Sequence, residues 1–164
     1  MIVIGLGANL SSPRYGGPRA ACEAALEALR GAGIEVLRCS RWYRSAPVPA
    51  SDQPWFVNAV AEVRTGLSAA ELLDLLHRIE REMGRMRQVR NEARIIDLDV
   101  LIYGETVSRP GATPILPHPR LAERSFVVLP LAELAPDWHH PGSGQSLQEM
   151  IRALPADQRA EAIE

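Results

Sequence analysis

The ten-residue stretch RIIDLDVLIY, from Arg94 to Tyr103, constrains the fold more than any other part of the chain. Its apolar residues follow one another almost without interruption and end at Gly104, which predicts a buried β-strand. Asp97 and Asp99 stand inside it at positions i and i+2, which a strand directs to the same face. Two carboxylates on one face of an apolar strand repel each other and lose hydration, so they need a shared counter-charge. A divalent cation such as Mg²⁺, which prefers carboxylate oxygens, would supply it.

An isolated D-x-D pair also has simpler explanations. Both aspartates could lie in water at the end of the strand, or one could form a structural salt bridge with Arg94. The pair alone does not separate these explanations from a metal site, so the flanking sequence has to decide.

The residues before the strand favour phosphate chemistry. Residues 85–94 contain Arg85, Arg87, Arg90 and Arg94 with little apolar periodicity, which predicts a mobile basic loop. A solvated charged loop is the alternative. Guanidinium forks beside paired carboxylates suit phosphoryl transfer, because the acids hold metal and the arginines hold charge on the phosphate oxygens.

Composition excludes several classes of protein. Every one of the 18 basic residues is arginine, so a Walker-type lysine is impossible. The net charge of −2 argues against a general nucleic-acid binder. No apolar run approaches the length of a membrane span, and no basic leader precedes the first apolar residues. Cys22 and Cys39 lack metal-ligand spacing, and Cys22 is expected to be a buried free thiol, which fits a reducing cytoplasm.

Hydrophobic periodicity and turn signals predict one domain over residues 1–164, with no repeat and no dividing linker. Ser68 and Glu71 form a capping box that starts a helix ending at Gly84. The tail after Pro155 is expected to fray. The other predicted elements are strands over 1–6, 34–44 and 55–64, helices over 18–30 and 145–154, and an apolar stretch over 127–134.

Two of these segments carry candidate ligand groups. The strand over 55–64 alternates, and we expect Val57 and its same-face neighbours to form the core. Asn58 shares the other face with Phe56, which suits a flat ligand, although on this segment alone an edge-strand Asn bonded to a loop is the better explanation. His118 lies between two prolines and six residues before Arg124, a placement that favours ligand binding. His139 and His140 have no further ligand at a metal-site spacing.

Six short segments together resemble the 6-hydroxymethyl-7,8-dihydropterin pyrophosphokinase family of folate biosynthesis. Each segment is weak alone, but their order and spacing along almost the whole chain are specific. They are residues 5–10 (GLGANL), 43–47 (YRSAP), 53–59 (QPWFVNA), 78–80 with 84–85 (RIE and GR), 93–94 with 97–99 (AR and DLD), and 117–121 with 124–126 (PHPRL and RSF).

The resemblance implies a fold and a reaction. The fold would be α+β and ferredoxin-like, an antiparallel sheet with helices on both faces in three layers, with the D-x-D strand in a central position. The reaction would pass the pyrophosphoryl group of ATP, the co-substrate, to the hydroxymethyl oxygen of the pterin and release AMP. The enzyme would be cytoplasmic, with monomer as the default state and no nucleic-acid or membrane partner.

The resemblance also implies residue roles. Asp97 and Asp99 would hold two Mg²⁺ ions, and Arg85 and Arg94 would be the arginines of the catalytic loop. Glu80, His77, His118 and Arg124 would contact ATP. The pterin would meet Ser45, Ala46, Val48, Phe56, Asn58 and Phe126, with Asn58 reading its edge and Phe126 stacking on it.

Two rival functions remain open on the residues alone. A nucleotidyltransferase also uses paired aspartates on a strand, but it would release pyrophosphate in place of AMP. A ligand-binding module without catalysis would keep its function when Asp97 is replaced by alanine.

Overall fold

The computed structural model describes residues 1–84 and 95–163. Within these residues the strands form one six-stranded antiparallel sheet in the order β5-β1-β4-β3-β6, and β2 also pairs with β4. The elements are β1 (Ile2–Ala8), α1 (Pro18–Gly31), β2 (Glu35–Cys39), β3 (Trp42–Ser45), β4 (Phe56–Arg64), α2 (Ala69–Glu82), β5 (Asp97–Tyr103), the short 3₁₀ turn η1 (Leu121–Glu123), α3 (Ser125–Leu134), α4 (Leu147–Ala153) and β6 (Ala160–Ile163).

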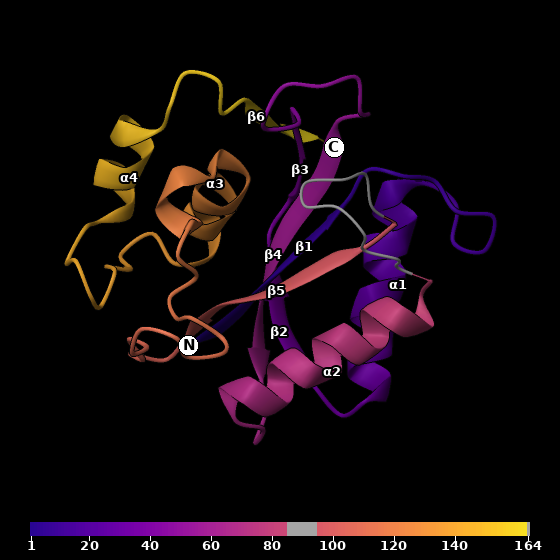
Figure 1. The fold of residues 1–164 in the computed structure, drawn as a ribbon, viewed down its shortest axis with the longest axis horizontal. Helices are drawn as coiled ribbons and strands as arrows, with labels where there is room; N and C mark the ends of the chain where they lie inside the picture. The colour runs from indigo at the N-terminus through magenta and orange to yellow at the C-terminus, as the bar shows by residue number, and fades with distance from the viewer. Residues whose placement is uncertain (85–94, 164) are drawn as a thin grey trace.

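The helices cover both faces of the sheet. Figure 1 shows α1 and α2 on one side and α3 and α4 on the other, which makes three layers. The chain order strand, helix, strands, helix, strand through β5 gives the ferredoxin-like arrangement, so the predicted α+β fold is confirmed. None of the helices in the described ranges combines the length and apolarity that crossing a bilayer requires.

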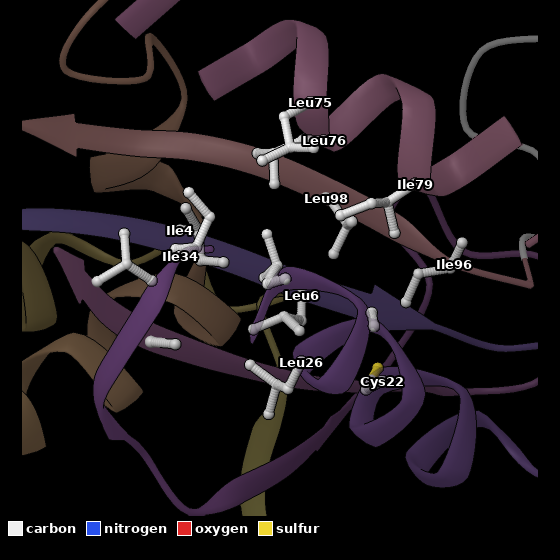
Figure 2. Packing of buried hydrophobic residues seen from close by; sticks show 14 of the residues in the cluster. Ile4, Leu6, Cys22, Leu26, Ile34, Leu75, Leu76, Ile79, Ile96 and Leu98 are labelled. Carbon is white, nitrogen blue, oxygen red and sulfur yellow. The ribbon is translucent and has the colours of Figure 1, made fainter. Parts of the chain in front are cut away.

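The first core lies between the sheet and the pair α1 and α2 (Figure 2). Helix α1 buries an apolar stripe that includes Cys22, whose burial was predicted, and this burial raises the pKa of the Cys22 thiol to about 12. Helix α2 starts at the predicted capping box, with Ser68 accepting from the Glu71 N–H. Gly84, just after α2, has a φ of +90°, which suits the glycine that was predicted to end this helix.

A second core lies on the opposite face, and it corrects the prediction that only one face of β4 is buried. Val60 belongs to this core and is 0% exposed, while Ala61 and Val63 belong to the first core. The apolar stretch after Phe126 forms α3, which packs on this face together with α4. Asn58, on the same face of β4 as Val60, therefore lies on a face that helices cover and not on a face open to solvent.

The strand predicted over residues 34–44 is two strands, β2 and β3, and the single-strand prediction is wrong. Ser40 stands between them, and its backbone N–H donates to the Val60 carbonyl at 2.9 Å. Its hydroxyl accepts from the Val60 N–H at 3.1 Å and donates to the Arg41 carbonyl at 2.8 Å. The Ser40 side chain thus replaces one main-chain hydrogen bond of the sheet. The strands β2 and β3 on either side of it still both pair with β4.

The D-x-D strand β5 lies at the edge of the sheet within the described residues, so its predicted central position is wrong. It begins at Asp97, and the preceding Ile96 is buried in the first core. Groups outside the sheet satisfy its outer edge, because the carboxylate of Glu80 accepts from the Leu98 N–H and the Leu101 carbonyl accepts from the His118 N–H, each at 2.9 Å.

The tail after Pro155 does not fray as predicted. It forms β6, which pairs with β3 so that Ser45 lies opposite Ala160 and Trp42 opposite Ile163. The predicted terminal helix is α4, which starts at the capping box of Ser146 and Glu149. Both ends of the chain thus contribute strands to the same sheet (Figure 1).

Candidate active site

The site is built on a row of residues that crosses three strands. In the register of the sheet, Gly7 of β1 lies between Asp97 of β5 and Asn58 of β4. Residues opposite one another in antiparallel strands point to the same face. The aspartates therefore share a sheet face with Asn58, on the side that carries α3, because the intervening Leu98 belongs to the core of α1 and α2.

Gly7 keeps the middle of this row open. A Cβ atom at this position would lie only 2.7 Å from Nδ2 of Asn58, well inside contact distance. The Gly-x-Gly segment of β1 thus serves a close approach inside a sheet and not the turn of a dinucleotide-binding loop.

Asn58 is fixed by a hydrogen bond beneath the pocket. The Ser45 hydroxyl donates to Oδ1 of Asn58 at 2.6 Å, and the two residues are 2% and 5% exposed. This bond sets which end of the amide is oxygen, so the amide group has a defined orientation.

One pocket gathers five of the six predicted pterin residues: Ala46, Val48, Phe56, Asn58 and Phe126. Ala46 and Val48 line it from the loop after β3, and Phe56 and Phe126 come from β4 and α3. Ser45 lies beneath it through its bond to Asn58. The complete lining is Gly7, Ala46, Pro47, Val48, Pro49, Gln53, Phe56, Asn58, Asp97, Arg120, Arg124, Phe126 and Gln158.

A second hollow adjoins this pocket and contains both aspartates. It shares Gly7, Asn58 and Asp97 with the first pocket, and it adds Asp99. Arg124 lines both hollows, with Nη1 4.0 Å from Oδ2 of Asp99 and its guanidinium 5.5 Å from the centre of the Phe126 ring. Acids, a guanidinium and an aromatic ring thus border one continuous site.

The acids fit magnesium carried in with a nucleotide. No group of three or more His, Cys, Asp or Glu side chains in the described ranges could enclose a metal ion alone. Mg²⁺ is usually held by one or two carboxylates together with substrate phosphates and water, and not by a complete protein cage. Asp97 and Asp99, on one face beside a hollow, are a donor set of this kind.

Glu80 contacts the outer edge of β5, the strand that carries the acids. It is 5% exposed on α2, and its Oε2 accepts from the N–H of Leu98, between the two aspartates. Its predicted contact with ATP stays a prediction, while its contact with the β5 backbone is direct.

The other predicted nucleotide residues lie outside the lining of both hollows. His77 is exposed on α2. His118 is half-buried, and burial together with the positive charges of Arg124 and Arg120 lowers its pKa to about 4. Its Nδ1 accepts from the Arg120 N–H at 3.2 Å, as a neutral imidazole can. The predicted catalytic pair, Arg85 and Arg94, lies outside the described residues, as does the rest of the predicted basic loop.

Sequence reasoning missed several residues of the site. Asn9 is 2% exposed, and its Nδ2 donates to Oε1 of Gln53 at 3.1 Å and to the Pro54 carbonyl at 3.0 Å, which ties the end of β1 to the pocket loop. The QP pair before Trp55 was a visible signal for this contact. Gln158 carries no such signal, because nothing in its local sequence differs from a surface tail.

Comparison with known proteins identifies this arrangement. The family model described as 7,8-dihydro-6-hydroxymethylpterin-pyrophosphokinase (HPPK) matches residues 3–136. The chain belongs to this family. It is an ATP-dependent pyrophosphokinase of folate synthesis.

Curated relatives agree with the family model. The chain is 41% identical over 152 residues to a 2-amino-4-hydroxy-6-hydroxymethyldihydropteridine pyrophosphokinase of Synechocystis, covering 93% of this chain and 75% of the relative. It is 39% identical over 155 residues to an enzyme of the same name from Pseudomonas aeruginosa, covering 94% and 91%. A folic acid synthesis protein of Pneumocystis carinii matches at 40% over 130 residues, which are 79% of this chain and only 17% of that protein.

Proposed function

We propose that the pyrophosphokinase reaction takes place in the pocket between β4, α3 and the acidic end of β5. The hydroxymethyl oxygen of the pterin attacks the β-phosphorus of ATP and loses its proton. The bond from the β-phosphorus to the α-phosphate bridging oxygen breaks, and AMP leaves. The observation that carries this proposal is the row Asp97, Gly7 and Asn58, in which a carboxylate and an amide lie on one sheet face with an open position between them.

The pterin would occupy the pocket lined by Phe56, Phe126 and Asn58. Its flat ring suits the two aromatic side chains, with Phe126 as the stacking partner. The amide of Asn58 can both donate and accept, as the edge of a pterin requires, and its bond to Ser45 pre-orients it. Ala46 and Val48 would enclose the ring from the loop after β3.

We assign Asp97 and Asp99 as the residues that hold two Mg²⁺ ions with ATP. When bound, these ions neutralise charge on the triphosphate oxygens. The carboxylates place that charge beside the pterin pocket, and Arg124 lies close enough to share it. Arg85 and Arg94 are proposed as further cationic groups for the phosphates.

The nucleotide would lie beyond the acids, at the outer edge of β5, which α2 and the segment around His118 both contact. His77 and His118 are proposed as contacts to it, since they are on these two elements. Glu80 is proposed to join them, in addition to its bond to β5.

We also propose that residues 1–164 act as one domain, as a monomer and in the cytoplasm. The single sheet, which includes strands from both ends of the chain, supports one domain. The two free cysteines suit a reducing compartment.

The test is nucleotide analysis after mixing the protein with ATP, Mg²⁺ and 6-hydroxymethyl-7,8-dihydropterin. We expect AMP in an amount equal to the pyrophosphorylated pterin, and no AMP without pterin. Asp97→Asn and Asp99→Asn should each lower kcat at least about 100-fold, because each removes a charge on the metal site.

Asp74→Asn is the matched control, because Asp74 is exposed on α2 and away from both hollows. This variant should keep wild-type turnover. Release of pyrophosphate in place of AMP would favour a nucleotidyltransferase, and full turnover in both aspartate variants would reject the assignment of the acids.

A further inference from the structure

The last residues of the chain form a wall of the pterin pocket. Gln158, which is half-buried, lines the pocket together with Phe56, Asn58 and Phe126. This residue lies beyond the segment that the family model matches, which ends at residue 136. Its position in the pocket is therefore a feature of this chain that the family match does not assign.

Contacts that do not involve the Gln158 side chain hold this segment in place. The Ala46 N–H donates to the Arg159 carbonyl at 3.0 Å, and Ser45 pairs with Ala160. The guanidinium groups of Arg44 and Arg159 lie 4.7 and 5.1 Å from the centre of the Trp55 ring. The backbone position of residue 158 is thus set by the β3 and β6 pairing, so its side chain can be changed without releasing the segment.

The amide oxygen of Gln158 has a hydrogen-bond partner, and its amide nitrogen is available to a ligand. Its Oε1 accepts from the N–H of Ser125, the first residue of α3, at 3.3 Å. Its amide nitrogen has no hydrogen-bond partner in residues 1–84 and 95–163. Because a primary amide carries two N–H donors beside its oxygen, anchoring the oxygen on α3 leaves these donors for the pocket that the residue lines.

We propose that Gln158 is a specificity-determining residue for the pterin, donating its amide N–H to an acceptor of the ring. This inference rests on the proposed assignment of the pocket to pterin. The pterin ring offers a carbonyl oxygen and ring nitrogens as acceptors. Asn58 lines the same pocket, and its Oδ1 already accepts the Ser45 hydroxyl, so both amides have N–H donors available for the ring. A ring without a matching acceptor would leave the Gln158 donors unpaired, which disfavours its binding.

The decisive variant is Gln158→Glu, which keeps an oxygen acceptor for the Ser125 N–H and removes the N–H donors. We expect KM for the pterin to rise about tenfold, because a pocket acceptor loses its donor and faces a carboxylate. KM for ATP should stay within about twofold, and Tm should stay at the wild-type value. Gln158→Leu, which removes both functions, should raise KM for the pterin to a similar extent and also lower Tm.

The matched control is Gln148→Glu, which makes the same change at an exposed position of α4. It should leave both KM values unchanged. An unaltered KM for the pterin in Gln158→Glu would overturn the inference. So would a Gln158→Leu variant whose two KM values rise together with its loss of Tm, because that pattern belongs to a purely structural role.

The outcome is separable from that of the proposed function. If wild-type protein forms AMP only with pterin, and Asp97→Asn abolishes this, the proposed function holds whatever the Gln158 variants do. If wild-type protein forms no AMP, the proposed function fails. Direct binding of the pterin to wild-type and Gln158→Glu protein, measured with a non-hydrolysable ATP analogue and Mg²⁺, then tests the Gln158 contact by itself. Equal pterin affinities would reject the contact.

Discussion

Gly7 is important for the site because it has no side chain. It lies on the site face between Asp97 and Asn58, where any side chain would point into the pocket. Other glycines of the chain, such as Gly31 at the end of α1, have open space around the position of a Cβ atom. The requirement for glycine at residue 7 is therefore steric, since its backbone conformation is that of an ordinary strand.

Replacing Gly7 with alanine should damage the pterin site more than the fold. The added methyl would meet Nδ2 of Asn58 at 2.7 Å, so the amide must move and its bond to Ser45 must weaken. Overpacking of this kind costs about 1–3 kcal/mol. We expect KM for the pterin to rise at least about tenfold, measured by initial rates at saturating ATP.

Gly31→Ala is the control for this change, because its methyl group meets nothing within 4 Å. This variant should retain wild-type KM and equal or slightly greater stability. Unchanged pterin binding in Gly7→Ala would mean that Asn58 does not need its present position.

At the scale of elements, α2 and β5 act as a unit. Strand β5 is an edge strand, and an edge leaves backbone N–H groups without partners in the sheet. Glu80 satisfies the Leu98 N–H from α2, so a buried carboxylate fixes the backbone between the two aspartates. The helix thus holds the main chain between the two acids.

Glu80→Ala should therefore destabilise the protein and lower turnover together. Leaving the Leu98 N–H buried without its acceptor costs about 1–3 kcal/mol, which urea unfolding can measure. Amide exchange at Leu98 should accelerate. Glu80→Gln keeps an acceptor oxygen and should lose less stability than the alanine variant.

Glu82→Ala provides the comparison on the same helix. Its side chain is 67% exposed and lies 3.7 Å from Arg78 in a surface ion pair, so its removal should cost less than about 1 kcal/mol. Equal losses in Glu80→Ala and Glu82→Ala would contradict the positioning role of Glu80.

Periodicity and a capping box predicted α1 and α2 well, because each buries a regular apolar stripe and α2 begins at its predicted cap. Helix α3 was predicted only as an apolar stretch. The break between β2 and β3 was not predictable in this way. Ser40 has no unusual local propensity, and its role depends on Val60, which is distant in sequence. The edge position of β5 likewise depends on pairing between distant strands.

The candidate site was predictable where the residue type itself carries the chemistry. Asp97, Asn58 and Phe126 were named from the sequence and lie in one pocket. Gln158 was not named, because neither the residue nor its short strand differs locally from a surface tail. Long-range contacts alone bring it to the pocket.

For the whole molecule, the free energy of unfolding should depend on pH through His118. Burial, with the charges of Arg124 and Arg120, lowers its pKa from 6.5 to about 4 in the folded protein. Above pH 6.5 the imidazole is neutral in both states. Between pH 6.5 and about 4 the unfolded chain binds a proton that the folded chain does not, so the free energy of unfolding decreases as the pH is lowered. The loss is on the order of 2 kcal/mol after solvent screening.

Urea unfolding of wild-type and His118→Gln protein at pH 7, 5.5 and 4.5 measures this contribution. The variant should lose less stability than the wild type over this range. His139→Gln, at an exposed position, should follow the wild type. Parallel losses in all three proteins would show that His118 does not couple folding to pH.

The pairing of β3 with β6 also affects the order in which parts of the fold can form while the chain is synthesised. Strands β1 to β5 leave the ribosome well before the last residues, and the acidic row with Asn58 needs only those strands. The wall that contains Gln158 cannot form until β6 (Ala160–Ile163) has also been made and has paired with β3. A nascent chain therefore forms the row of Asp97, Gly7 and Asn58 first and the wall that contains Gln158 later.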